Sequence, residues 1–199
     1  MQQPVATRAT EHRLLVNAGV VAAATGLIAL AAQVSWGYPV PTTLQTFAVF
    51  SVAAVLGARR GVAAVLLYLG LGAVGAPVFA EGHGGATWLS AADSLHASGG
   101  YLWGFLLAAV TVGVISDRFG RSFYVMVPAM LLGSVALYVP GLIWLHQAFP
   151  IAWSGEGDTI LHWGLWPFVY GDLAKIFAAA AVADPVAPWG RYAARLHNL

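Results

Sequence analysis

The chain has 199 residues, of which 59% are hydrophobic and only 9% are charged, and its formal net charge is +1. A soluble domain has about a quarter charged residues, so this chain lacks the charged side chains needed to cover a water-facing surface, and the composition indicates an integral membrane protein. The near-zero net charge argues against a nucleic-acid-binding protein, which needs a basic surface, and the absence of Cys removes disulfides and Cys-bound metals from consideration.

Six apolar segments are candidate membrane-spanning helices, so we expect an all-α membrane protein. We place them at residues 14–33, 44–58, 62–79, 99–115, 123–145 and 160–183. Several are shorter than the about 20 residues that cross the hydrocarbon core of a bilayer, so we expect local thinning, tilt or partial submersion. Residues 1–199 are expected to form a single integral membrane domain.

The positions of the basic residues predict the topology. With six spans, every Arg falls on one side of the membrane, in four pairs: Arg8 and Arg13, Arg59 and Arg60, Arg118 and Arg121, and Arg191 and Arg195. The loops on the opposite side, residues 34–43, 80–98 and 146–159, contain neither Lys nor Arg. Because basic loops stay in the cytoplasm, both termini are expected to be cytoplasmic and the protein to lie in the inner (plasma) membrane.

The first segment allows a second interpretation. Basic residues before an apolar run, followed by Ala29-Leu30-Ala31, resemble a cleaved signal peptide. We expect the segment to be retained instead, because Ala18, Ala22 and Gly26 recur every four residues and form a stripe along which another helix can approach closely. Helices rich in Ala also form such stripes by chance.

The first outward loop is stiff and polar. Pro39 and Pro41 restrict its backbone, and Thr43, Gln45 and Thr46 place hydrogen-bonding groups at the outer end of the predicted bundle. Thr43 and Gln45 are therefore candidate ligand-binding residues. An ordinary interfacial turn with a helix-capping Thr is the alternative.

The fourth predicted span opens on a pair of glycines followed by aromatic residues. Gly99 and Gly100 could present backbone N–H groups to a ligand, and Tyr101 and Trp103 could line its binding site. The same glycines could equally permit tight packing of two helices.

The last segment combines an acid and a base. Pro167 and Gly171 predict that the final helix begins only near Gly171, which places Asp172 and Lys175 on one face of its first turn. Charged residues within a membrane helix are costly and usually mark function, so both are candidate site residues. An ion pair that only holds the helix in place is the structural alternative.

An enzymatic or metal-dependent function has weaker support in the sequence. The outward loops and helix ends carry four His without a paired metal-binding spacing, so no metal site is expected: His83, His96, His146 and His162. Ser98 and Ser154 are candidate nucleophiles outside any G-x-S-x-G pattern. No P-loop motif is present, so the chain is not expected to use ATP by that mechanism. A small membrane enzyme that uses the acid–base pair or the outward His residues remains an alternative.

Several blocks of the sequence resemble the BioY family, the biotin-specific S components of energy-coupling-factor (ECF) transporters. The most specific are residues 39–46 (PVPTTLQT) and 99–105 (GGYLWGF), and residues 171–175 (GDLAK) follow in the family's order. The chain departs from the family at residues 96–98, where HAS replaces the usual Gly-Pro-Thr, and at Tyr170, where Pro is usual. These differences leave an S component for another vitamin as an alternative.

The resemblance implies an ECF S-component fold of six helices that binds biotin in an outward-facing pocket and performs no chemistry on it. The implied partners are a membrane coupling protein and two cytoplasmic ATPase subunits, with no cofactor and no metal. The stripe at Ala18, Ala22 and Gly26 resembles the family's docking face for the coupling protein. The expected substrate-binding residues are Thr43, Gln45, Gly99, Gly100, Tyr101, Trp103, Asp172 and Lys175.

The chemistry of biotin suits these residue types. We expect Asp172 to face the two ureido N–H groups, and Tyr101 and Trp103 to pack against the sulfur ring and the valeryl chain. The carboxylate would meet Lys175 or backbone N–H groups near Gly99. The alternative is that Asp172 and Lys175 neutralise each other.

Overall fold

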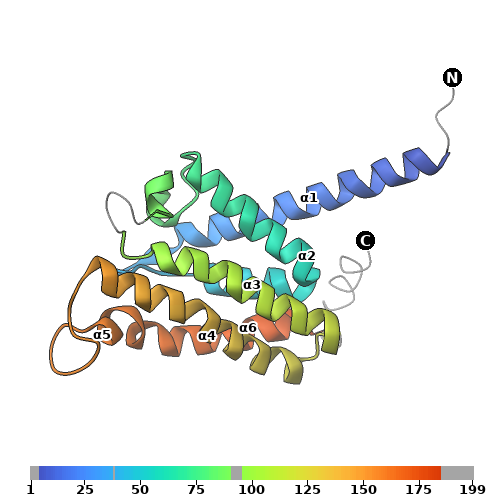
Figure 1. Cartoon of the computed structure of the whole chain (residues 1–199). Coiled ribbons are helices and arrows are strands. Elements are labelled where there is room, and N and C mark those ends of the chain that lie inside the picture. The colour runs from blue at the N-terminus through green and yellow to red at the C-terminus, as the bar shows by residue number, and fades with distance from the viewer. Residues whose placement is uncertain (1–4, 38, 91–95, 185–199) are drawn as a thin grey trace.

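The chain folds into a bundle of long helices with a small β-ribbon at one end (Figure 1). The computed structural model describes residues 5–37, 39–90 and 96–184. The helices are α1 (Val5–Gln33), α2 (Gln45–Ala73), α3 (Gly99–Phe119), α4 (Phe123–Ala148), α5 (Ile160–Gly164) and α6 (Trp166–Ala183). Within the described residues, five helical stretches are long and apolar enough to cross a membrane, with α5 and α6 forming one of them. The expectation of a mostly helical membrane protein is confirmed.

Helix α2 reverses direction at Gly57, whose backbone (φ 76°, ψ 179°) is not helical. Gln45 Nε2 donates a hydrogen bond of 2.7 Å to the Tyr68 hydroxyl, although these residues would lie about 35 Å apart along a straight helix. Residues 45–56 and 58–73 therefore run side by side in opposite directions. The reversal lies one residue before the end of the predicted span 44–58, close to the gap left before the span 62–79.

Two predicted helix ends were wrong. The span predicted to end at residue 79 ends at Ala73, because Gly75 adopts φ 96° and the chain then folds the ring of Phe79 back against Gly72. The final helix begins at Trp166 instead of near Gly171. Pro167 lies in its first turn, where the missing backbone N–H has no helical partner to lose.

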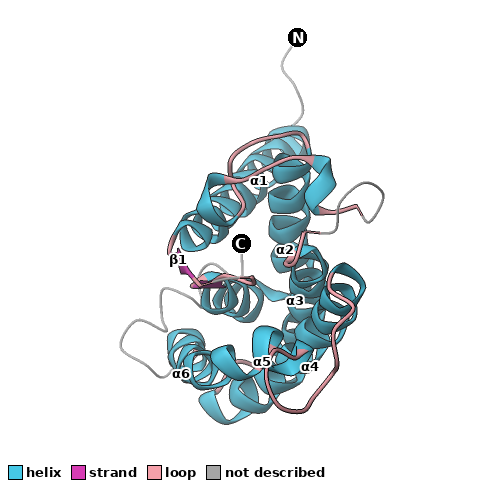
Figure 2. Cartoon of the chain, turned by 90° about the vertical axis from the view of Figure 1, so that its left-hand side faces the viewer, coloured by secondary structure: helices cyan, strands magenta, loops and turns pink. Residues whose placement is uncertain are grey.

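The fold also contains a short β-ribbon that the all-α prediction missed. Strands β1 (Ser35–Trp36) and β2 (Thr42–Thr43) pair antiparallel within the first loop that was predicted to face outward. The ribbon is followed by a hydrogen bond of 3.3 Å from Leu44 N to the Val34 carbonyl. Seen from the loop end, the ribbon lies in the opening between the helices (Figure 2). The ribbon therefore holds this loop across the opening to the interior of the bundle.

Glycines bring α3 and α4 close together. A side-chain carbon added at Gly100 would collide with Trp144 and with the Pro140 carbonyl, and one at Gly104 would collide with the backbone of Leu137. This spacing of four residues gives α3 a small-residue face that lets the α4 backbone approach. The interpretation of Gly100 as a packing residue, which the sequence left open, is the one that the contacts support.

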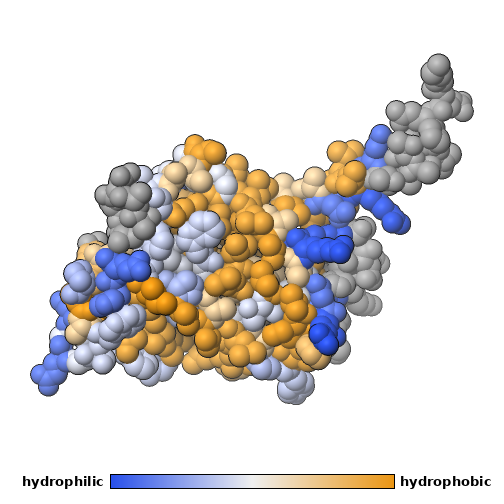
Figure 3. Space-filling view, viewed as in Figure 1, coloured by the Kyte–Doolittle hydropathy of each residue, from blue (hydrophilic) through white to orange (hydrophobic). Residues whose placement is uncertain are grey.

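The polar residues gather at the two ends of the bundle, and an apolar surface covers its middle (Figure 3). At one end, Ala58 N donates to the Asp117 carboxylate at 3.0 Å, which joins the α2 reversal to the end of α3. Phe123 N likewise donates to Asp184 at 3.1 Å. Arg59 and Arg118 thus lie at the same end as the end of α6, whereas the short helix α5 lies at the other (Figure 1). Arg191 and Arg195 lie outside the described residues.

Candidate ligand-binding site

An inner cavity lies between α2, α3, α4 and α6, beneath the β-ribbon. Its free volume is about 50 Å³, which is below the about 300–1,000 Å³ typical of small-molecule sites, so the side chains that line it must move apart to admit a larger ligand. Its lining is mostly apolar with a few polar groups and comprises Val40, Pro41, Thr43, Gln45, Thr46, Phe79, Ala80, Trp88, Ser98, Tyr101, Leu102, Phe105, Leu137, Tyr138, Phe168, Asp172 and Lys175.

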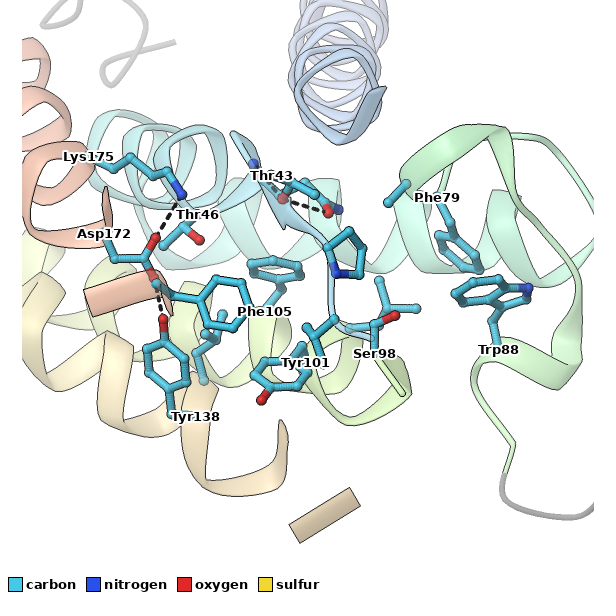
Figure 4. A pocket seen from close by; sticks show the side chains of 17 residues that line it. Thr43, Thr46, Phe79, Trp88, Ser98, Tyr101, Phe105, Tyr138, Asp172 and Lys175 are labelled. Atoms are coloured by element: carbon cyan, nitrogen blue, oxygen red, sulfur yellow. Dashed lines mark hydrogen bonds and ion pairs between the residues drawn. The ribbon is translucent and has the colours of Figure 1, made fainter. Parts of the chain in front are cut away.

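One end of the inner cavity holds a buried charged group (Figure 4). Lys175 Nζ lies 2.8 Å from Asp172 Oδ1, and the two side chains are 10% and 7% exposed. The Tyr138 hydroxyl donates to the other carboxylate oxygen, Asp172 Oδ2, at 2.6 Å. Each carboxylate oxygen keeps a further acceptor position and the ammonium keeps further N–H donors. This cluster can therefore offer both donors and acceptors to a neutral polar ligand without a change in net charge.

A second polar cluster lies where α2 begins. The Thr43 hydroxyl donates to Gln45 Oε1 at 3.1 Å, and Gln45 N donates back to the Thr43 oxygen at 3.2 Å. Gln45 Nε2 donates to Tyr68 across the α2 hairpin. Thr43, Gln45 and Thr46 are 8%, 4% and 6% exposed, so the ribbon and the hairpin hold these side chains at the cavity with little contact with solvent.

Aromatic side chains form the walls between these polar groups. The rings of Tyr101 and Tyr138 meet edge to face at 6.1 Å, and the Tyr101 hydroxyl donates to the Gly164 carbonyl at 2.8 Å. At the opposite end from Asp172, Phe79 and Trp88 close the cavity (Figure 4). Their ring centroids are 6.3 Å apart. Such walls suit a ligand with an apolar middle.

A more polar outer space, here called the vestibule, adjoins the inner cavity. It is lined by Gly37, Pro39, Pro41, Ala80, Glu81, His83, Trp88, His96, Ala97, Ser98 and Phe149. Pro41, Ala80, Trp88 and Ser98 line both spaces. The rings of His83 and His96 both pack on Trp88, whereas that of His146 packs on Trp153 and His162 lines a different space. The four His predicted to face outward are therefore not gathered at one place.

Five of the eight predicted substrate-binding residues line the inner cavity: Thr43, Gln45, Tyr101, Asp172 and Lys175. The other three do not. Gly99 packs against Trp144, and its N–H already donates to the His96 carbonyl at 3.1 Å. Gly100 faces α4. Trp103 is 40% exposed and its indole donates to the Leu89 carbonyl at 3.1 Å, because it lies on a different face of α3 from Tyr101.

Tyr138 is the main cavity residue that the sequence analysis did not single out as a ligand contact. It lies in the middle of α4, within an otherwise aliphatic stretch. A phenol hydroxyl within a membrane span needs a hydrogen-bond partner, and α6 provides the one acidic side chain among the described residues of that helix. A phenol and a carboxylate within two membrane spans therefore suggest a hydrogen bond between them, but the sequence did not show which faces of α4 and α6 meet.

The small-residue stripe on α1 faces away from the bundle. Ala18, Ala22 and Gly26 are all exposed, and a Cβ added at Gly26 would have no neighbour within 4 Å. The opposite face of α1 packs on α2, where the Thr25 hydroxyl donates to the Ala64 carbonyl at 3.0 Å. The stripe is therefore accessible from the apolar surface of the protein.

Comparison with known proteins shows which protein family this chain resembles. Residues 2–191 match the family model described as the BioY family. The chain belongs to the BioY family. The Thermotoga maritima protein named "Biotin transporter BioY" is 37% identical over 172 residues, covering 86% of this chain and 94% of the relative. The Rhizobium etli protein of the same name is 34% identical over 183 residues, covering 87% and 92%.

A solved structure extends the BioY comparison to the fold. The chain superposes with a TM-score of 0.71 on the S component for biotin from an ECF-type ABC transporter, at 23% sequence identity. The match covers 92% of this chain and 93% of the other. The fold is therefore that of an ECF S component.

Proposed function

We propose that this protein is the biotin-binding S component of an ECF-type vitamin importer. The proposal is carried by one observation: an elongated, mostly apolar cavity with a buried acid–base–phenol cluster at one end, in a chain whose BioY relatives are named biotin transporters. The protein binds its ligand and delivers it without changing it chemically. Its cavity and its relatives favour this function over that of a membrane enzyme.

The chemistry of biotin matches the residues along the cavity. The two ureido N–H groups can donate to Asp172, and Lys175 can donate to the ureido carbonyl while it stays paired with the carboxylate. The sulfur ring and the valeryl chain lie against Tyr101 and Phe105. Thr43 and Gln45 shape the side of the cavity beneath the ribbon. In this proposal, biotin lies along the axis from Asp172 towards Trp88.

We further propose six membrane crossings within one integral membrane domain, residues 1–199, with both termini cytoplasmic in the inner membrane. The two halves of α2 count as separate spans, because they run antiparallel on either side of Gly57. At about 18 and 24 Å they are shorter than the about 30 Å of hydrocarbon, so part of the outward loop lies below the membrane surface. The basic residues at the α2 reversal and the α3–α4 turn then face the cytoplasm.

Cysteine labelling tests this topology without background, because the chain has no Cys. Trp36→Cys, Thr87→Cys and Ser154→Cys are expected to react with a membrane-impermeant maleimide in intact cells. Ser122→Cys should react only after the membrane is permeabilised. If Trp36→Cys and Thr87→Cys label from opposite sides, α2 crosses the membrane once and the six-span topology is wrong.

The importer requires energising partners, and we propose a membrane coupling protein with two cytoplasmic ATPase subunits. The exposed stripe at Ala18, Ala22 and Gly26 is the proposed docking face for the coupling protein. Small residues let a partner helix approach the α1 backbone, and this face is not covered by the bundle.

Equilibrium binding of radiolabelled biotin to the detergent-purified protein tests the function directly. We expect saturable binding close to one biotin per chain, unchanged when other vitamins are added in excess. A folded sample that binds no biotin, but binds another vitamin, would retain the S-component function and overturn the ligand. A folded sample that binds none would contradict both.

A further inference from the structure

Two imidazoles pack on the tryptophan that closes the outer end of the inner cavity. The rings of Trp88 and His96 are stacked at 4.1 Å with an interplanar angle of 5°, and the ring of His83 lies 4.7 Å from that of Trp88. Trp88 lines both the inner cavity and the vestibule, and both His line the vestibule. The imidazoles therefore lie where the outer end of an elongated ligand leaves the cavity.

Other positively charged side chains are missing from this part of the described structure. The outward loops, residues 34–43, 80–98 and 146–159, contain no Lys or Arg. Lys175 lines the inner cavity, but it is paired with Asp172 at the far end from Trp88 (Figure 4). Among the described residues that line the two spaces, His83 and His96 are thus the groups near Trp88 that can become cationic.

The hydrogen bonds hold both His residues in defined positions. His83 Nδ1 donates to the Ala80 carbonyl at 2.9 Å, so its Nε2 accepts in the neutral form and donates when protonated. The carbonyl of His96 accepts a hydrogen bond of 2.8 Å from the Trp144 indole, which anchors this residue beside the start of α3. The aromatic face of Trp88 also favours a cation placed against it.

We propose that His83, His96 and Trp88 form a subsite for the terminal carboxylate of the ligand. This rests on the proposed function, because it takes biotin as the ligand with its ureido ring at Asp172. The indole covers the end of the alkyl chain, and the protonated imidazoles pair with the carboxylate. The charged end of biotin is thereby bound at the vestibule, away from the Asp172–Lys175 pair.

The subsite makes binding depend on pH. Imidazoles change charge between about pH 5 and 8, so a carboxylate ligand should bind more tightly as the pH falls through this range. Glu81 is the other titratable group lining the vestibule among the described residues. Its carboxylate lines the same space as the proposed position of the ligand carboxylate and would repel it, so Glu81→Gln is expected to strengthen biotin binding at pH 6.

The test compares biotin with its uncharged carboxamide, biotinamide, at pH 6 and pH 8. Wild-type protein is expected to bind biotin about fivefold more tightly at pH 6 than at pH 8, whereas the affinity for biotinamide stays constant. The double variant His83→Gln/His96→Phe keeps an aromatic ring on Trp88 but cannot carry the charge. It should bind both ligands equally at both pH values.

A matched control is His146→Gln, which replaces another outward His whose ring packs on a Trp, at 4.7 Å from Trp153, but which lines neither space. This variant should keep the wild-type preference for biotin at pH 6. A double variant that retains the preference, or a biotinamide affinity that follows pH as biotin does, would overturn the subsite while leaving biotin as the ligand. Loss of binding of both ligands by the wild type would overturn the proposed function and the subsite with it.

Discussion

Replacing Asp172 by Asn is expected to weaken biotin binding by at least tenfold, which corresponds to about 1.4 kcal/mol. Asp172 is 5% exposed, and its two oxygens accept hydrogen bonds from Lys175 and Tyr138. An amide replaces one acceptor oxygen by a donor, so it loses the ion pair and cannot accept from both ureido N–H groups. Equilibrium binding of labelled biotin to the purified variant measures the effect.

The double variant Asp172→Asn/Lys175→Met separates binding from stability. Asp172→Asn alone leaves the Lys175 ammonium buried without its carboxylate, which in protein interiors costs about 3–5 kcal/mol. Removing both charges should return the unfolding temperature close to that of the wild type while biotin binding stays weak. Normal binding by the double variant would mean that the pair only holds α6 in place, as the structural alternative states.

Tyr138→Phe provides a milder comparison within the same cluster. It keeps the ring and its edge contact with Tyr101, and it removes only the hydrogen bond to Asp172 Oδ2. The variant keeps the carboxylate of Asp172 and its ion pair with Lys175, so we expect a smaller loss of biotin affinity than for Asp172→Asn. A larger loss would indicate that the phenol contacts the ligand itself.

Gly57→Ala is expected to destabilise the protein strongly. The position combines φ 76° with ψ 179°, a backbone region that costs other residues about 1–3 kcal/mol. A Cβ there would also collide with the Asp117 carboxylate, which caps Ala58 N and joins the α2 reversal to α3. The measurement is the thermal unfolding midpoint in detergent.

Gly70→Ala is the control on the same helix. Gly70 has no atom within 4 Å of an added Cβ and no positive φ, and Ala favours helix over Gly by about 1 kcal/mol. Its unfolding midpoint should equal or exceed that of the wild type. If Gly57→Ala were as stable as Gly70→Ala, the reversal at Gly57 would not be part of the native fold.

The apolar segments could be predicted from the sequence because each is long and strongly hydrophobic. The ends of the helices were harder to predict. Pro167 is compatible either with a helix break or with the first turn of a helix, and only the packing of α6 decides between them. The ribbon at Ser35–Trp36 and Thr42–Thr43 was missed, because two-residue strands carry no periodic pattern.

Some residues of the candidate site could likewise be predicted from the sequence, and others could not. Asp172 and Lys175 could be found because charged residues within a span are rare, and Thr43 and Gln45 because the loop is unusually polar and rigid. Trp103 shares its motif with Tyr101, but two residues along a helix turn the side chain by about 200°, so the two cannot face one cavity. Tyr138 was missed because its role depends on the register between α4 and α6.

The first half of α2 sets the thickness of the dielectric barrier that remains beneath a bound ligand. Gln45 touches the inner cavity and Gly57 marks the opposite end of this half, which gives about 18 Å of helix against a hydrocarbon core of about 30 Å. In the topology proposed above, the Arg-bearing turn lies at the headgroups, and a ligand in the cavity would have crossed more than a third of the insulating layer. On this proposal, the transmembrane voltage would fall across a thinner layer at this protein than across the surrounding bilayer, and the proposed energised step would move the ligand over only that shorter distance.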